Sequence, residues 1–226
     1  MIKNNNGGIF ILKDMIEKQF LKELLDNGVH IIDFKTTYIS RNSKIGKNTI
    51  IYPNNYIENS TIGENSIIKN GNYIFSSKIG DNTQLTLSYL EDSTIGENTT
   101  IENYSIIKNT QIGDNSFVGS FVDIKNCKLF NDVNILSSCN INNCEINNNT
   151  FINSGSVICN FNGNKNLKTI IGGNCFIGSN VNIISPVIIG DNNYIYSGLN
   201  IYKNIDNNQF VISNLELIIK PDYHKK

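Results

Sequence analysis

The chain has 226 residues, of which 39% are hydrophobic, and its formal net charge is −1 at pH 7. This near-neutral balance gives no electrostatic reason to expect nucleic acid or an acidic membrane as a partner. Arg41 is the only arginine, so any phosphate that the chain binds must be met mainly by lysine side chains and backbone amides. No apolar run reaches the roughly 20 residues that span a bilayer, and no signal-peptide core follows Met1, so we expect a cytoplasmic protein.

An amphipathic pattern near the N-terminus predicts one short helix. It covers residues 14–26, with Asp14 and Glu17 as a capping pair and Asn27-Gly28 as the stop signal. Residues 1–34 are therefore expected to hold a disordered start, this helix and a lead-in strand.

Aliphatic residues then recur with a fixed period through most of the chain. The steps between them are six, six and five residues, so most turns of the repeat take 17 residues. A small residue stands two positions before nearly every one of these aliphatic anchors, so two independent periodicities mark the same repeat. Three short strands per turn would form a triangular coil with the anchors inside. We expect this coil over residues 35–205, followed by a C-terminal tail at residues 206–226.

The same repeat assigns the corners and the cysteines. Gly or Asn after an anchor, as in Ile62-Gly-Glu-Asn65, suits corners that need a positive φ. Cys127, Cys139, Cys144 and Cys175 occupy the small inner position, which predicts buried free thiols. Cys127 and Cys144 lie one turn apart, at about 4.8 Å, so a disulfide is geometrically possible, although a reducing cytoplasm disfavours it. No Cys-x-x-Cys pair occurs, so no metal site is expected.

One polar loop interrupts the repeat, and a loop that a regular scaffold carries only once is the first place to look for a site. It is expected at residues 159–170, after the anchor Ile158. Lys108, Lys125 and Asn142 each follow an anchor on the same face as Ile158. Because residues one turn apart stack at about 4.8 Å, the two lysines predict a basic ladder that leads to the loop. The ladder could hold a phosphate, and the alternative is that these lysines serve only solubility.

The repeated phrase Ile-Gly-x-x-x-x resembles the left-handed parallel β-helix acyltransferases. The similarity is closest in Phe121-Val-Asp-Ile-Lys125, Cys159-Asn-Phe-Asn-Gly163, Lys168-Thr-Ile-Ile-Gly172 and Phe176-Ile-Gly-Ser179. These segments resemble the acetyltransferase half of the bifunctional N-acetylglucosamine-1-phosphate uridyltransferase/glucosamine-1-phosphate N-acetyltransferase family. The resemblance covers about residues 14–215 and implies an all-β fold, a left-handed parallel β-helix with a short N-terminal helix. It also implies acetyl-CoA as donor, an amino sugar or its phosphate as acceptor, a homotrimer, and active sites between neighbouring subunits.

On the acceptor side, the resemblance assigns roles to five residues. Lys125 matches a substrate-binding lysine, and Asn160 matches an asparagine that contacts the amino sugar. Phe161 stands at a tyrosine, with the ring kept and the hydroxyl lost. Lys108 lies at or beside the position of a sugar-phosphate arginine. Lys165 is next to the position of a loop lysine and could meet the same anion from a neighbouring subunit.

On the donor side, Ser179 matches a serine that lines the acetyl-CoA groove, and Ser197 lies near an alanine with a similar role. The general-base histidine of the family falls on Ser137. A base is useful because an ammonium group cannot attack a thioester until it loses its proton. The chain has only His30 and His224, both outside the repeat, so the catalytic residue stays unassigned.

Three functions therefore remain open. The first is an acetyl-CoA-dependent N-acetyltransferase that acts on an amino sugar or amino-sugar phosphate without a histidine base. The second is a catalytically silent trimeric β-helix that binds a sugar nucleotide, a partner or nothing. The third is an acyltransferase with a different acceptor, because nearly every departure from the family falls on the acceptor side.

Overall fold

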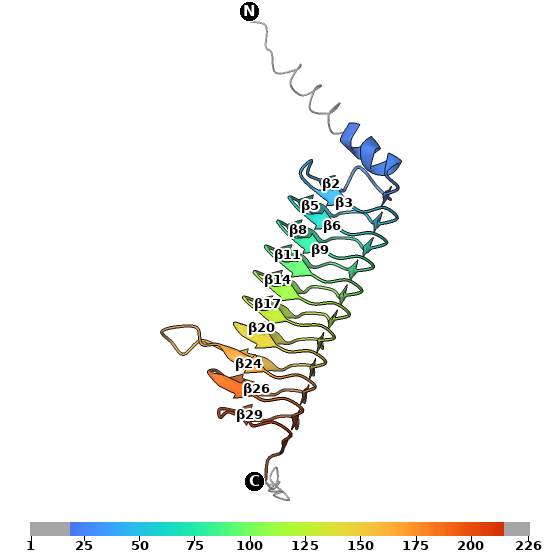
Figure 1. The fold of residues 1–226 in the computed structure, drawn as a ribbon. Coiled ribbons are helices and arrows are strands. Elements are labelled where there is room, and N and C mark those ends of the chain that lie inside the picture. Colours follow the sequence, from blue (N-terminus) through green and yellow to red (C-terminus); the bar gives the residue numbers. More distant parts are fainter. Residues whose placement is uncertain (1–18, 215–226) are drawn as a thin grey trace, which may run out of the picture.

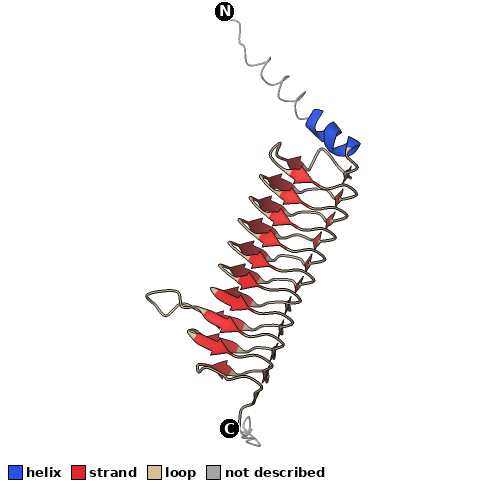
Figure 2. Ribbon diagram, viewed as in Figure 1, coloured by secondary structure: helices blue, strands red, loops and turns tan. Residues whose placement is uncertain are grey.

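The computed structural model describes residues 19–214. In this range the chain is wound into one long coil of short parallel strands, with a helix at its N-terminal end and a loop that projects from its side (Figures 1 and 2). Each turn contributes one strand to each of three parallel sheets, which run along the coil. The arrangement is the left-handed parallel β-helix that the sequence analysis expects.

The first sheet contains β1 (His30–Ile31), β4 (Ile50–Ile51), β7 (Ile67–Ile68), β10 (Gln84–Leu85), β13 (Thr100–Ile101), β16 (Phe117–Val118), β19 (Asn134–Ile135), β22 (Phe151–Ile152), β25 (Phe176–Ile177), β28 (Tyr194–Ile195) and β30 (Phe210–Val211). The second sheet contains β2 (Tyr38–Ile39), β5 (Tyr56–Glu58), β8 (Tyr73–Phe75), β11 (Tyr89–Glu91), β14 (Ile106–Lys108), β17 (Asp123–Lys125), β20 (Asn140–Asn142), β23 (Val157–Cys159), β26 (Asn182–Ile184) and β29 (Asn200–Ile201). The third sheet contains β3 (Lys44–Ile45), β6 (Thr61–Ile62), β9 (Lys78–Ile79), β12 (Thr94–Ile95), β15 (Gln111–Ile112), β18 (Lys128–Leu129), β21 (Cys144–Ile146), β24 (Thr169–Ile171) and β27 (Val187–Ile189).

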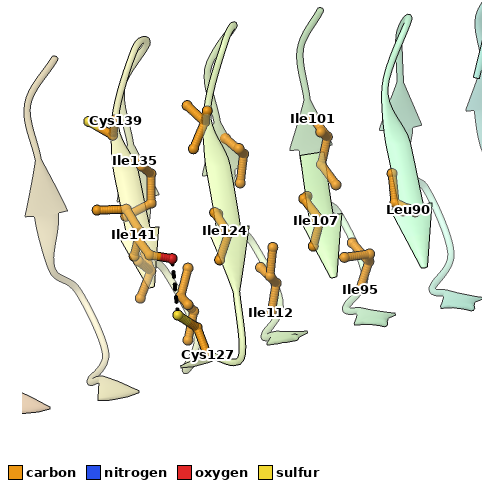
Figure 3. Packing of buried hydrophobic residues seen from close by; sticks show 14 of the residues in the cluster. Leu90, Ile95, Ile101, Ile107, Ile112, Ile124, Cys127, Ile135, Cys139 and Ile141 are labelled. Carbon is orange, nitrogen blue, oxygen red and sulfur yellow. Dashed lines mark hydrogen bonds between the residues drawn. The ribbon is translucent and has the colours of Figure 1, made fainter. Parts of the chain in front are cut away.

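The aliphatic anchors fill the interior of the coil, as predicted (Figure 3). Leu90, Ile107 and Ile124 are completely buried and are register partners on three successive turns. Side chains alternate between the two faces of a strand, so the neighbours of each anchor point outward. The coil thus has a continuous aliphatic core, and its three outer faces can carry polar residues that contact solvent or a ligand.

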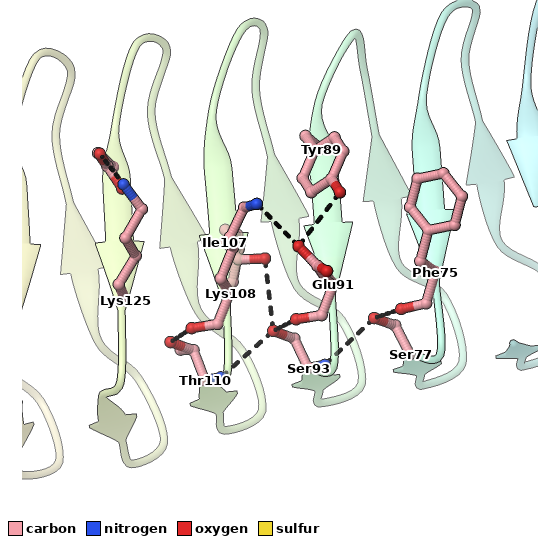
Figure 4. A network of polar contacts seen from close by, with 10 residues as sticks. Phe75, Ser77, Tyr89, Glu91, Ser93, Ile107, Lys108, Thr110 and Lys125 are labelled. Atoms are coloured by element: carbon pink, nitrogen blue, oxygen red, sulfur yellow. Dashed lines mark hydrogen bonds and ion pairs between the residues drawn. The ribbon is translucent and has the colours of Figure 1, made fainter.

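The small residue two positions before each anchor also links one turn to the next. Ser93 Oγ donates to the backbone carbonyl of Glu91 at 2.7 Å and accepts from the backbone N–H of Thr110 at 3.2 Å (Figure 4). Ser77 Oγ accepts in the same way from the N–H of Ser93. A buried hydroxyl is costly unless it is hydrogen-bonded, and this pattern satisfies each one.

The four cysteines at this inner position are buried and free, as predicted. Their thiols take the place of the hydroxyls, and Cys127 Sγ donates to the carbonyl of Ile141 at 3.2 Å (Figure 3). Cys144 Sγ donates to Cys127 Sγ at 3.1 Å, so the pair meets as two thiols.

At the corners between the third and first sheets, Gly and Asn have different structural roles. Asn48, Asn65 and other residues three positions after an anchor have a positive φ, as predicted for Asn. The prediction is wrong for the Gly directly after the anchor, since Gly46 has no positive φ. A Cβ on Gly46 would lie 2.5 Å from the backbone of Gly63 in the next turn, so this glycine is required by the close approach of two turns.

The two ends of the described range close the coil differently. The helix is described over residues 19–26, and Gly28, with φ of 84°, ends it as predicted. Its Leu24 packs into the core. The predicted capping pair lies outside the described residues. β30 lies in the range assigned to the C-terminal tail and pairs with β28.

Within residues 19–214 there is no apolar helix of membrane-spanning length.

Two adjacent isoleucines in β14 test this division into core and surface. Ile107 is completely buried, whereas Ile106 is 39% exposed on the outer face. We expect Ile107→Ala to lower the free energy of unfolding by about 2–5 kcal/mol, because it leaves a cavity in the core. Ile106→Ala should cost about 1 kcal/mol or less. Urea unfolding followed by circular dichroism measures both, and equal losses would contradict the inward direction of Ile107.

Candidate functional site

Four residues on the outer face of the second sheet form a continuous row. Glu91, Lys108, Lys125 and Asn142 are register partners on β11, β14, β17 and β20. We call this set the outer row. The predicted stacking of the two lysines and Asn142 is therefore present. The pairing of β20 with β23 places Cys159 next in the row, at the base of the loop.

Lys108 is held by its neighbour on the preceding turn. Its Nζ lies 2.7 Å from Glu91 Oε2 and 4.5 Å from the centre of the Tyr89 ring (Figure 4). Tyr89 OH donates to the same Glu91 Oε2 at 3.1 Å. The hydrogen bond from Lys108 lowers the pKa of Glu91, and the hydrogen bond to Glu91 raises the pKa of Lys108. Burial beside Glu91 raises the pKa of Tyr89.

Lys125 is paired within its own strand. Its Nζ donates to Asp123 Oδ2 at 2.7 Å (Figure 4). On the next turn, Asn142 Nδ2 donates to Asn140 Oδ1, and Asn140 is the register partner of Asp123. Two acceptor atoms in this cluster, Asp123 Oδ1 and Asn142 Oδ1, are buried and have no hydrogen-bond partner among the described residues. Buried acceptors of this kind call for a donor, which a ligand can supply.

The loop lies between β23 and β24 and projects away from the coil (Figure 1). Phe161 and Asn166 form an antiparallel bridge at its neck, and the N–H of Leu167 donates to the carbonyl of Asn160 at 2.7 Å. Asn162 Oδ1 accepts from the N–H of Lys165 at 3.0 Å. Asn160 is partly buried at the base, whereas Phe161 is 64% exposed.

The structure therefore brings only some of the predicted acceptor residues together within one chain. Lys108 and Lys125 share one face, and Asn160 directly follows Cys159 of the same face. The loop carries the exposed Phe161 and Lys165 away from the coil.

The donor-side residues lie on a different edge, the corner between the first and second sheets. The N–H of Ser179 donates to Ser197 Oγ at 3.0 Å. The N–H of Ser120 donates to Ser137 Oγ at 3.2 Å, so Ser137 occupies the same kind of corner position as Ser197. Within residues 19–214, the hydrogen bonds of Ser137 all involve backbone groups or the Cys139 thiol, and no basic side chain activates its hydroxyl.

Neither histidine lies in this region of the described structure. His30 is exposed on β1, in the first turn of the coil. His224 lies outside the described residues. No group of three metal-ligating side chains occurs in the part of the chain that the structure describes.

Three residues of the site were missed by the sequence analysis, although a signal for each was available. Glu91 follows the anchor Leu90 just as Lys108 follows its own anchor one turn later. Asp123 stands two positions before Lys125, and alternation along a strand places both on the outer face. Cys159, the one exposed cysteine, follows the anchor Ile158.

Comparison with known proteins identifies the repeat. The family described as bacterial transferase hexapeptide (six repeats) matches residues 42–76, 92–125 and 168–203. These three segments carry the hexapeptide repeat of this family. It is 35% identical over 212 residues to the bifunctional protein GlmU of Caldicellulosiruptor saccharolyticus, covering 93% of this chain and 46% of that relative. It is 30% identical over 217 residues to the GlmU of Clostridium novyi, covering 95% of this chain and 48% of the relative. The hexapeptide-repeat chain thus spans about half the length of these curated relatives.

Solved structures agree on the fold of the hexapeptide-repeat chain. The UDP-N-acetylglucosamine acyltransferase from Campylobacter jejuni superposes with a TM-score of 0.54 at 20% identity, over 78% of this chain and 68% of that one. The Francisella novicida UDP-N-acetylglucosamine acyltransferase gives a TM-score of 0.50 at 18% identity, over 79% of this chain and 66% of that one. At these sequence identities, the similarity shows that the chain shares the fold of these structures and nothing further.

The cysteines give a direct test of the site's exposure. We expect iodoacetamide at pH 8 to modify Cys159 in the folded protein and to leave the other four cysteines unmodified until the protein is unfolded. The four are buried, and burial raises the pKa values of Cys139 and Cys175. The hydrogen bond between Cys127 and Cys144 raises the pKa of Cys144, which burial raises further, and lowers the pKa of Cys127. Cys127 is therefore protected by its burial alone.

Peptide mass spectrometry before and after unfolding would locate the modified thiols. Cys159→Ser is the control and should abolish labelling of the folded protein. Rapid labelling of Cys127 or Cys144 in the folded state would contradict the packing of the inner position.

Proposed function

We propose that this chain is an acetyl-CoA-dependent N-acetyltransferase whose acceptor is an amino sugar or amino-sugar phosphate. The observation that carries the proposal is the outer row, in which Lys108, Lys125 and Asn142 lie on one face and lead to the base of the loop. The amino group and the hydroxyls of a sugar can form hydrogen bonds with the charged and amide side chains of this row. The similarity to the GlmU relatives supports acyl transfer at the same place.

The proposed reaction is attack of a neutral amine on the thioester carbonyl of acetyl-CoA, which forms an amide and releases the CoA thiol. The acceptor would lie against Lys108, Lys125 and Asn160, with Phe161 and Lys165 reaching it from the loop. Ser179 and Ser197 would line the path of acetyl-CoA along the corner between the first and second sheets. No metal takes part in this scheme, and the buried free thiols fit a location in the reducing cytoplasm.

Catalysis in this proposal relies on positioning. Ser137 stands where the resemblance places a histidine, and its hydroxyl caps the N–H of Ser120. An amine with a pKa near 8 is roughly one-tenth deprotonated at pH 7, and correct orientation of two bound reactants can supply much of the acceleration. Loss of the histidine therefore lowers the rate without removing the reaction.

Release of the CoA thiol on mixing acetyl-CoA with glucosamine or glucosamine 1-phosphate tests the proposal. Lys125→Ala should lower kcat/KM about tenfold to a hundredfold, the range for loss of a charge-assisted hydrogen bond to substrate. Lys128→Ala is the matched control, because Lys128 lies over the Phe130 ring on the third sheet. It should retain wild-type activity.

The outcomes of this assay separate the alternatives. Turnover with another amine but with neither amino sugar would favour an acyltransferase with a different acceptor. Absence of acetyl-CoA binding in calorimetry would favour a catalytically silent binding protein. Full activity of Lys125→Ala would contradict the role of the outer row.

We also propose that the chain acts as a homotrimer in which the loop of one subunit completes the site of its neighbour. The loop that carries Phe161 and Lys165 projects from the coil (Figure 1), and both residues are exposed. Sedimentation equilibrium should give three times the chain mass of 25.3 kDa.

Co-expression tests the shared site. Two variants are compared, Lys125→Ala and the double variant Phe161→Ser with Lys165→Ala. Each should have low acetyltransferase activity when it is expressed alone. Mixed trimers should recover about a quarter of wild-type activity. In randomly assembled trimers, an intact outer row of one subunit faces an intact loop of its neighbour at about one site in four. No recovery in mixed trimers would place the loop and the outer row in the same subunit's site.

A further inference from the structure

Three lysines around the candidate site are already paired with carboxylates of this chain. Lys108 pairs with Glu91 at 2.7 Å, Lys125 with Asp123 at 2.7 Å, and Lys168 with Glu145 at 2.8 Å. On the outer face of the second sheet, Glu91, Lys108, Asp123 and Lys125 sum to zero charge. A phosphate bound there would meet two carboxylates as well as two ammonium groups.

Glu91 is fixed more firmly than a typical surface carboxylate. Its Oε2 accepts from both Tyr89 OH and Lys108 Nζ, and the Tyr89 ring also lies under the Lys108 ammonium group (Figure 4). Lys108 is therefore held by a carboxylate and a ring at once. A phosphate at Lys108 would have to compete with Glu91 for the positive charge of this ammonium group.

The two oxygen atoms of this cluster without a hydrogen-bond partner among the described residues need a donor, which a fully ionised phosphate does not provide. Asp123 Oδ1 and Asn142 Oδ1 are acceptors, and a phosphate presents further acceptors. A phosphomonoester carries about −1.5 to −2 charge at pH 7, so it would be repelled by these oxygens. The amino group and the hydroxyls of a sugar are donors and suit acceptors of this kind.

We infer that the acceptor of this site is an amino sugar without a phosphate group, and that Glu91 determines this selectivity by neutralising Lys108. The inference rests on the proposed function and narrows its substrate class. It departs from the expectation that the ladder of Lys108 and Lys125 holds a phosphate. Glu91 acts on specificity through Lys108, without contact between Glu91 and the reacting atoms.

The test compares kcat/KM for glucosamine and for glucosamine 1-phosphate in the full chain. The wild type should use glucosamine at least as well as the phosphate. Glu91→Gln keeps the side-chain shape and frees Lys108, so it should shift the ratio about tenfold toward the phosphate, the size of one charge-assisted hydrogen bond.

Glu58→Gln is the matched control. Glu58 stands two turns earlier on the same sheet and accepts from Tyr56 OH at 3.2 Å, but no ion pair with lysine is found for it among the described residues. This variant should leave the ratio unchanged. A structural effect of losing a tyrosine–glutamate contact would appear in both variants, whereas release of Lys108 would appear only in Glu91→Gln.

A calorimetric titration with inorganic phosphate keeps this inference separable from the proposed function. Glu91→Gln should bind phosphate about tenfold more tightly than the wild type. Equal phosphate affinity in the two proteins, or a wild type that prefers glucosamine 1-phosphate tenfold, overturns the inference even if acetyl transfer is found. Failure of acetyl-CoA to bind or react overturns the proposed function, and the phosphate titration still decides the role of Glu91.

Discussion

Successive turns of the coil are hydrogen-bonded in a fixed register, so that along most of the chain each residue lies beside the residue 17 positions later. This constraint stacks equivalent side chains at about 4.8 Å. Where the side chains attract one another, the stacking stabilises the coil. Tyr38 and Tyr56 stack with ring centres 4.5 Å apart, and Asn48 donates to Asn65 at 3.2 Å.

The same register becomes a cost where the stacked residues carry like charge. Lys108 and Lys125 are direct neighbours, and like charges opposite each other destabilise a sheet. Glu91 on the preceding turn and Asp123 on the same strand remove this repulsion. The electrostatics of the candidate site therefore follow from the stacking of the scaffold. The acceptor that the site can hold depends on how much charge is left after these pairs have formed.

Features that depend on one turn and its repetition could be predicted from the sequence. The anchors, the buried cysteines, the stacking of Lys108 on Lys125 and the position of the loop all follow from the 17-residue period. Contacts that depend on side-chain reach could not be predicted. The period places Glu91 beside Lys108, but it does not determine whether the lysine turns toward this carboxylate or toward solvent. The glycine after each anchor was predicted to serve a positive φ, whereas the close approach of two turns requires it. A sequence gives no measure of the distance between two turns.

In the proposed function, Ser137 at the position expected for a histidine and the neutralisation of Lys108 are connected through the pKa of the acceptor amine. A phosphate near an amine stabilises the ammonium form and raises the amine's pKa. Such an acceptor gains most from a general base, because little of it is deprotonated at pH 7. An amino sugar without a phosphate has a lower amine pKa and a larger fraction of free amine, so it needs a base less. If the acceptor carries no phosphate, as we infer, the site depends less on a histidine at the position of Ser137, and the two differences would describe one change of substrate.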